Sequence, residues 1–209
     1  MTNIILEACV ETFQQAATAE ANGASRIELC DRLDLGGLTP PMELTGRLLR
    51  TLRIPIMAMV RPRGGDFVFS KEEFEGMKTE IDKLKDLGCR GVVIGLLTPE
   101  GRIDIKRTRS LVELARPLQV TFHKAFDECA DLSLALADLK ETGVDRLLTS
   151  GGMKTAQEAV LVLNRLIEEA GEMIQLIVAG KVTHENINVL SRQIPLACEF
   201  HGKKIVRGI

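Results

Sequence analysis

The stretch RIELCDRLDLGGLTP, residues 26–40, contains the segment from which the fold can be worked out. Its Ile-Glu-Leu-Cys at 27–30 repeats the pattern of Leu-Glu-Ala-Cys at 6–9, and a helical pattern lies between the two segments. On a β-strand, residues two apart share a face, so the glutamate and the cysteine of each segment point the same way. A carboxylate and a thiol that face one side of two neighbouring strands are unusual in a packed core. The repeat therefore predicts two strands and, at their ends, a candidate site.

Short apolar segments alternate with helical patterns along the rest of the chain. The segments are rich in Ile, Leu and Val and mostly lack the alternation of a sheet face exposed to water, which is typical of buried parallel strands. We expect eight strands, at residues 4–8, 27–30, 54–60, 91–97, 118–122, 145–149, 174–179 and 196–200. Helices are expected at residues 12–22, 42–52, 70–87, 104–116, 132–142, 155–170 and 184–192.

This alternation predicts a TIM barrel, that is, a (β/α)8 fold of the α/β class, rather than an open doubly wound sheet. No linker or low-complexity stretch marks a second domain, so we expect a single barrel domain over residues 1–209. Residues 201–209, after the eighth strand, carry no clear helical pattern. The final helix of the barrel is therefore predicted to be short or missing.

The composition argues against several classes of partner. A net charge of −2 gives no general electrostatic reason to bind nucleic acid or an anionic membrane, and without Trp or Tyr a base-stacking platform is not expected. No apolar stretch approaches the length of a membrane span. The five cysteines make an odd number without the spacing of a disulfide framework, so we expect reduced thiols and a cytoplasmic protein.

Polar residues collect where the expected strands end, which is the end of a barrel where sites are built. The helix-to-strand turns carry no comparable collection, so this asymmetry predicts a functional site. Its members are Glu7, Cys9, Glu28, Cys30, Asp31, Arg61, Arg63, Asp66, His123, Lys124, Asp127, Thr149, Ser150, Lys181, Glu199 and His201.

The first candidate site consists of two thiols. Cys9 and Cys30 end corresponding strands and can both face the barrel mouth. Soft thiolates select Cu(I) or zinc over hard cations, and two thiolates suit a low-coordinate Cu(I) site better than a four-ligand zinc site. The alternative is that both are small buried hydrophobes, as free cysteines often are. Because barrel layers take side chains from alternate strands, the two thiols can also be staggered.

The second candidate site is a group for acid–base catalysis. His123 at a strand end, near the carboxylates of Asp127, Glu28 and Glu7, can titrate near neutrality and act as a general acid or base. The alternative is a hydrogen-bonded structural histidine in the barrel rim. His201 offers a weaker version of the same signal.

The third candidate site binds an anion. Arg61 and Arg63 flank a proline, and arginine forks suit carboxylate or phosphate. The sequence Ser150-Gly151-Gly152 offers backbone N–H groups ahead of a helix, which also suits phosphate. For the arginines, ion pairs with Asp66 or with the strand-end glutamates are an equally good interpretation.

Taken together, six ordered motifs resemble the CutC family, usually called copper homeostasis proteins. They run from the first to the sixth strand, and His201-Gly202 resembles the family's end of the eighth strand. The motifs are EACV (7–10), GASRIELC (23–30), GGLTP (36–40), RPRGGDF (61–67), TFHKAFD (121–127) and LTSGG (148–152).

The resemblance implies a (β/α)8 barrel, a cytoplasmic location, association into homodimers or larger homo-oligomers, and Cu(I) binding with Cys9 and Cys30 as the copper ligands. His123 is a candidate third ligand. The chain departs from the family pattern in the expected lack of a closing helix after the eighth strand and at two residues. Lys124 stands where arginine is usual, and Lys181 interrupts a stretch that is usually rich in glycine, so we expect no glycine-based phosphate cradle there.

Two functions follow from these observations, with a third as a contrast. The first is a cytoplasmic copper homeostasis protein that binds a copper ion through Cys9 and Cys30. The second is a TIM-barrel enzyme for a small anionic ligand, which Arg61 and Arg63 hold while Glu28, His123 or Asp127 transfers protons. The third is an assembly protein whose site is a relic.

Overall fold

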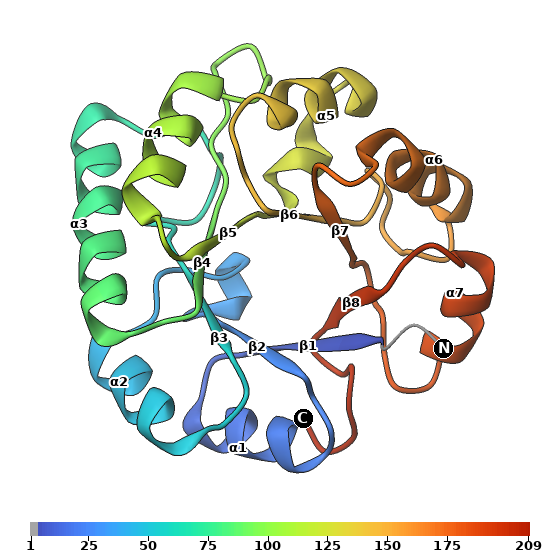
Figure 1. Cartoon of the computed structure of the whole chain (residues 1–209), viewed down its shortest axis with the longest axis horizontal. Helices are drawn as coiled ribbons and strands as arrows, with labels where there is room; N and C mark the ends of the chain where they lie inside the picture. The colour runs from blue at the N-terminus through green and yellow to red at the C-terminus, as the bar shows by residue number, and fades with distance from the viewer. Residues whose placement is uncertain (1–3) are drawn as a thin grey trace.

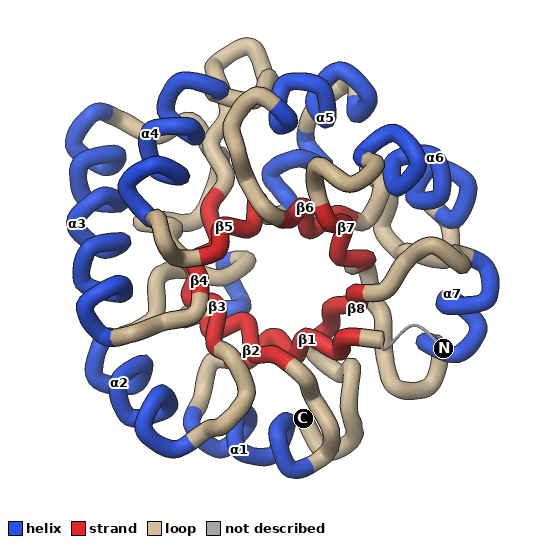
Figure 2. The backbone as a smooth tube through the Cα atoms, in the orientation of Figure 1, coloured by secondary structure: helices blue, strands red, loops and turns tan. Residues whose placement is uncertain are grey.

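Eight parallel strands pair in chain order, and the last pairs with the first, so the sheet closes into a barrel (Figure 2). The structure is a computed structural model that describes residues 4–209. All residues of the second, third and fourth strands are buried, and the third and fourth strands are accordingly apolar throughout, whereas the second also buries the charged Arg26 and Glu28. The strands are β1 (Ile5–Val10), β2 (Arg26–Leu29), β3 (Ile56–Met59), β4 (Gly91–Ile94), β5 (Gln119–Phe122), β6 (Arg146–Thr149), β7 (Gln175–Val178) and β8 (Glu199–Gly202).

Seven α-helices of the described residues surround the barrel, and the predicted (β/α)8 fold is confirmed (Figure 1). Within residues 4–209, no helix combines the length and the apolar character that a membrane crossing needs. The helices are α1 (Phe13–Ala21), α2 (Met42–Thr51), α3 (Lys71–Leu87), α4 (Ile105–Ala115), α5 (Leu132–Lys140), α6 (Val160–Ala170) and α7 (Ile187–Gln193). Two 3₁₀ helices follow β2 and β5, namely η1 (Leu33–Leu35) and η2 (Lys124–Glu128).

Several predicted elements begin later in the structure than in the sequence pattern, among them α6, α7 and β8. Helix α6 starts at Val160 instead of 155, because the Ala156 N–H donates to the carbonyl of Gly180 (2.8 Å) and ties these residues to the loop after β7. Strand β8 starts at Glu199 instead of 196, because the chain is still turning at Ala197, whose N–H donates to Ile194 (3.0 Å). The shift of β8 places the His201 side chain within a strand.

No α-helix follows β8 among the described residues, as predicted. The segment after β8 instead packs its apolar side chains against the outside of the barrel. Ile205 and Val206 are buried in one cluster with Ala16 and Ala19 of α1. The C-terminal segment therefore covers the junction of β8 and β1 that an eighth helix covers in a complete barrel.

The interior of the barrel is tightly packed around Met57 on β3, and the residue paired with Met57 on β4 is Gly91. A Cβ atom on Gly91 would lie 2.2 Å from the Met57 Cε atom and 2.5 Å from the Gln119 carbonyl oxygen. Met57 in turn pairs with Glu28 on β2, so it packs at the level of the predicted site. The absence of a side chain at Gly91 thus lets Met57 fill the interior beside Glu28.

We expect Gly91→Ala to lower the free energy of unfolding by about 3 kcal/mol, because backbone and side chain must both move to admit one methyl group. Gly76 in α3 is the matched control, since no atom lies within 4 Å of a Cβ placed there. Gly76→Ala is expected to raise the free energy of unfolding by about 1 kcal/mol through helix propensity. Urea denaturation measures both, and equal effects of the two substitutions would contradict this packing.

Candidate functional site

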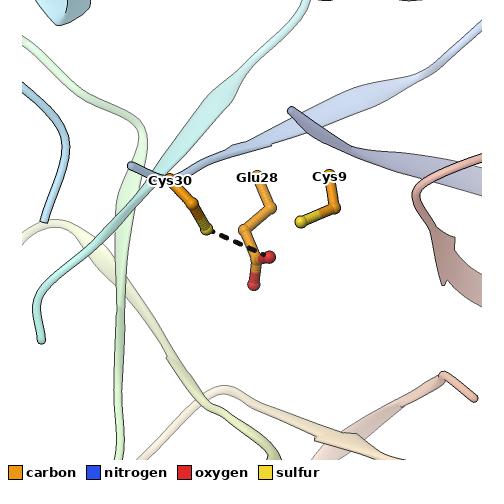
Figure 3. Close-up of side chains that lie close together, drawn as sticks. All are labelled: Cys9, Glu28 and Cys30. Atoms are coloured by element: carbon orange, nitrogen blue, oxygen red, sulfur yellow. Dashed lines mark hydrogen bonds between the residues drawn. The ribbon is translucent and has the colours of Figure 1, made fainter. Parts of the chain in front are cut away.

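The two Glu-x-Cys segments pair with a shift of two residues. Glu7 lies opposite Arg26 and Cys9 lies opposite Glu28, so Cys30 stands one interior layer closer to the mouth than Cys9. The stagger does not separate the thiols, because the two Sγ atoms and a Glu28 carboxylate oxygen all lie within 4.8 Å of one another. Figure 3 shows the Glu28 carboxylate between the two sulfurs, with the Cys30 thiol donating to it at 3.5 Å.

The surroundings of these thiols are soft and apolar. Cys9 and Cys30 are buried, neither forms a disulfide, and they pack in one cluster with Met57, Met59 and Val93. A cavity of about 170 Å³ opens beside Cys9 toward the barrel mouth. Its lining includes Cys9, Glu28, Met59, Arg61, Phe67, His123 and His201. The cavity therefore joins residues from all three predicted candidate sites.

Beneath the thiols, buried ion pairs cross the interior of the barrel. Arg26 is ion-paired with both Glu7 and Glu199. Glu199 is also paired with Arg146, whose Nε atom lies 3.2 Å from its carboxylate. His201 lies 2.9 Å from Glu7 through Nδ1 and 3.7 Å from Glu28 through Nε2. Glu7 is therefore an ion-pair partner inside the barrel and does not face the open mouth.

Burial and ion pairing shift the pKa values of the groups in this cluster in opposite directions. Burial raises the pKa of Glu7, but the hydrogen bond from His201 and the charge of Arg26 outweigh it and bring the value to about 2. Burial lowers the pKa of His201, yet Glu28, Cys9 and Glu7 together raise it well above its usual range. Burial raises the pKa of Glu28 well above its usual range despite the nearby His201. The two carboxyl groups of the cluster, Glu7 and Glu28, thus have pKa values shifted in opposite directions.

The two thiols also differ from each other. The neighbouring Cys30 thiol, helped by His201, lowers the pKa of Cys9 well below its usual range in spite of burial. The neighbouring Cys9, with burial and the charge of Glu28, raises the pKa of Cys30 well above its usual range. The pKa values of the two thiols are therefore shifted in opposite directions, with that of Cys9 the lower.

His123 lies on the opposite side of the cavity and behaves differently from the prediction. Its Nδ1 atom accepts a hydrogen bond from the Ala125 N–H (3.1 Å), and its Nε2 atom has no partner among residues 4–209. Burial and the charge of Arg61 lower the pKa of His123 to about 3 instead of leaving it near neutrality. The ring is neutral at pH 7, with its proton on Nε2.

Asp127 is held away from Glu28 by the loop after β6. Its carboxylate accepts hydrogen bonds from the Ser150 N–H (3.0 Å), the Gly152 N–H (3.0 Å) and both hydroxyls of Thr149 and Ser150. The Gly151 N–H donates to the Thr149 hydroxyl (2.9 Å). The predicted phosphate loop is therefore occupied by a carboxylate of the chain itself, and the structure does not join Asp127 to Glu28 and His123.

The two arginines of the predicted anion site have separate environments. Arg63 is ion-paired with Asp66 (2.9 Å) and Glu73 (2.7 Å). Arg61 is buried, and its guanidinium donates to the carbonyls of Leu35 (3.1 Å), Gly37 (3.3 Å) and Gly65 (2.8 Å). Among the described residues no carboxylate lies within 4.0 Å of Arg61, and its Nε atom has no partner.

Arg61 is consequently a buried cation without a neutralising carboxylate, at the wall of two cavities. Burial, with the charge of Arg63, lowers its pKa from the ordinary value. It lines the 170 Å³ cavity and a second cavity of about 660 Å³ that also reaches Asp127. Of the residues predicted to bind an anion, Arg61 alone combines burial with an unused donor.

Sequence reasoning placed too little weight on His201, and it did not single out Met59 as a site residue. His201, not His123, contacts Glu7 and Glu28, because β8 begins three residues later than predicted and pairs His201 with Glu7. The signal that could have found it is the alternation Glu199-Phe200-His201, which puts two polar side chains on the interior face.

These features define a class: a (β/α)8 barrel whose mouth carries a buried cluster of thiols, carboxylates and histidine. Residues 4–205 match the sequence profile of the CutC family, and the chain belongs to this family. It is 42% identical over 197 residues to the human copper homeostasis protein cutC homolog, covering 94% of this chain and 72% of that protein. A family protein CutC of Xanthomonas campestris is 40% identical, covering 94% and 82% respectively.

A crystal structure of a CutC protein from Streptococcus agalactiae superimposes with a TM-score of 0.92. That protein is 30% identical to this one, and the match covers 97% of this chain and all of the other. The fold and the family are thus supported by sequence and by structure independently.

We expect Glu7→Gln to lower the free energy of unfolding at pH 7 by about 3 kcal/mol, because Arg26 and His201 each lose a buried anion. In the wild type, a pKa of about 2 against an ordinary 4.5 contributes stability above pH 4.5 that is lost as the pH falls toward 2. The variant should lack this part of the acid dependence. Urea denaturation between pH 7 and pH 2.5 measures it.

Glu43→Gln is the matched control for this experiment, since Glu43 is exposed at the start of α2. It should unfold like the wild type across the whole pH range. If Glu7→Gln follows the same curve as the control, the buried ion pair does not contribute to stability.

Proposed function

We propose that this protein acts in copper homeostasis by binding Cu(I) through Cys9 and Cys30. The observation that carries the proposal is that two free, buried sulfurs lie within 4.8 Å of each other at the barrel mouth. An ion midway between them would be at most about 2.4 Å from each, half of 4.8 Å, which is close to the roughly 2.3 Å of a zinc–thiolate bond. The spacing is therefore suitable for two-coordinate binding of a soft ion.

The chemistry around the thiols supports the same proposal. The pKa of Cys9 is lowered and that of Cys30 is raised, so Cys9 is the thiol that loses its proton more readily when the metal binds. The thioethers of Met57 and Met59 in the same cluster are soft groups, and the burial of the cluster protects Cu(I) from water. With all five cysteines unpaired, we also propose a cytoplasmic location.

The proposal uses two ligands and does not need His123. Coordination through its Nε2 atom would move the ring proton to Nδ1 and break the hydrogen bond from the Ala125 N–H. Glu28, which lies beside both sulfurs, is the nearest group that can take up the proton released from Cys30. We also propose, on the family resemblance alone, that the chain associates into a homodimer or a larger homo-oligomer.

We expect the wild type to take Cu(I) from bicinchoninate under anaerobic, reducing conditions. Cys9→Ser and Cys30→Ser should each weaken the affinity by more than about 100-fold, because the loss of even an outer-shell partner costs 10–100-fold. Cys89→Ser is the matched control, since Cys89 is equally buried but packs in a different cluster. Equal Cu(I) affinity of the Cys9, Cys30 and Cys89 variants would refute the proposal.

A second candidate function is supported by Arg61. A buried guanidinium without a carboxylate and with an unused Nε donor is suited to hold a small anionic substrate in the mouth. Under this proposal Glu28 transfers the proton, because its pKa is raised and it lines the same cavity, and the His123 Nε2–H donates a hydrogen bond to the substrate. The surroundings of this substrate site are supported by Asp127, Arg63 and the Ser150–Gly152 loop.

Oxalate is a suitable probe, because its paired carboxylates match the guanidinium fork. We expect Arg61→Lys, which keeps the charge but loses the fork, to weaken oxalate binding about tenfold, equivalent to one charged hydrogen bond. Arg63→Lys should stay within about twofold of the wild type, since Arg63 is already ion-paired. Calorimetric titration measures all three proteins, and no difference between the two variants would exclude Arg61 as the anion ligand.

A further inference from the structure

A third cavity opens at the barrel mouth, over the ends of β7 and β8, and neither candidate function assigns it a role. Its volume is about 500 Å³, within the range of small-molecule sites. The loop after β7 and the turn after β8 form most of its wall, and these two strands lie side by side in the barrel (Figure 1). We refer to it as the lysine cleft, and its five lysines are Lys124, Lys154, Lys181, Lys203 and Lys204.

The charge of the lysine cleft is opposite to that of the chain as a whole. The sequence has 27 basic and 29 acidic residues, yet five of the eleven residues that line the cleft are lysine and none is Asp or Glu. Five ammonium groups around one concave surface attract an anion much more strongly than scattered surface charges do. The cleft therefore concentrates positive charge at one place on a slightly acidic protein.

The positive charges of the cleft are largely free of internal partners. Lys154, Lys181 and Lys204 have no carboxylate within 4.0 Å among residues 4–209. Lys203 donates to the carbonyl of Leu33 (3.2 Å), which leaves its charge in place. Lys124 lies 3.6 Å from Asp127, a carboxylate that already accepts hydrogen bonds from the loop after β6.

The backbone of the cleft wall is held in an unusual conformation at Lys181. Its φ angle is 54°, in the left-handed region that a non-glycine residue seldom adopts, and it follows Gly180 with a φ of 101°. A Cβ on Gly180 would lie 2.8 Å from the Ser150 Cβ, so the loop runs against its neighbour without room to relax. A side chain kept where glycine would be unstrained points to a use for that side chain.

The position of the cleft and its chemistry favour phosphate over other anions. In TIM barrels the loops after the seventh and eighth strands frequently form a phosphate site, and lysine binds phosphate as a point charge. A single-stranded nucleic acid would need stacking aromatics, and no aromatic residue other than His201 lines this cleft. Lys124, His201 and Lys203 also line the 170 Å³ cavity, so the two cavities adjoin.

We infer that the lysine cleft binds the phosphate group of a phosphorylated small molecule, whose remaining part extends toward the cavity beside Cys9 and Arg61. The inference goes beyond the copper proposal, and it rests on the second candidate function only in the direction that the ligand extends. It agrees with the expectation that no glycine-based phosphate cradle lies after β7, because here lysine charges and not glycine amides supply the attraction.

Inorganic phosphate and glycerol 3-phosphate are the two probes, and calorimetric titration of the full chain measures their binding. We expect both to bind, and glycerol 3-phosphate to bind more tightly because it also occupies space next to the phosphate. Lys181→Gly is the test variant, since it removes one charge and also relieves the left-handed backbone, so the protein should remain folded. It should weaken both probes about tenfold, the loss of one charged contact.

Lys71→Ala is the matched control, because Lys71 is an exposed lysine at the start of α3, outside the cleft. It should bind both probes like the wild type. No saturable binding of either probe, or equal affinity in the Lys181→Gly and Lys71→Ala proteins, overturns the inference. Equal affinity of the wild type for the two probes would also overturn it, since it would indicate a site for free phosphate and not for a phosphorylated molecule.

The outcome is separable from that of the second candidate function. If Arg61→Lys loses oxalate binding while Lys181→Gly binds glycerol 3-phosphate like the wild type, the Arg61 site is supported and the lysine cleft is refuted. The reverse result supports the lysine cleft and refutes Arg61 as an anion ligand. Melting temperatures of the variants show whether any loss of binding comes from unfolding.

Discussion

The buried ion pairs of Arg26 hold together the place where the barrel closes. Arg26 on β2 is ion-paired with Glu7 on β1 and with Glu199 on β8. Arg146 on β6 forms a further ion pair with Glu199. Two charges taken out of water are stabilised only when each has a well-placed partner, so the positions of these side chains are strongly coupled. His201 is held by the same Glu7, so the ion pairs also position the histidine that lines the cavity with Cys9.

Above this layer the barrel mouth has two chemically different regions. On β1, β2 and β3 it is soft and apolar, with the thiols of Cys9 and Cys30 beside Met59. Over β7 and β8 it is cationic, with unneutralised lysines, and Arg61 stands between the two regions as a buried cation. Membership of the CutC family connects the first region with the copper proposal. The second region has the charge and the shape of a site for an anionic small molecule.

The alternation of buried apolar segments with helical patterns was sufficient to predict the barrel, and the lack of a helical pattern after the eighth strand was sufficient to predict the missing final helix. The site was predicted less completely. Cys9, Cys30, Glu28, Arg61 and His123 all line or adjoin the cavity, but Asp127, Arg63 and the Ser150–Gly152 loop are satisfied by internal contacts. Strand-end position indicates that a side chain is near the mouth, yet it does not indicate whether another part of the chain already uses its hydrogen bonds.

The sequence by itself determined the fold class, the strands that carry the site and the end of the barrel at which it lies, because hydrophobic periodicity and strand polarity are local properties. Only the tertiary structure decided which polar groups meet. Strand register places Cys9 opposite Glu28 and His201 opposite Glu7, and closure of the barrel brings β8 to β1 across nearly the whole length of the chain. Charge neutralisation, burial and the pKa values that follow from them depend on these long-range neighbours, which no local pattern specifies.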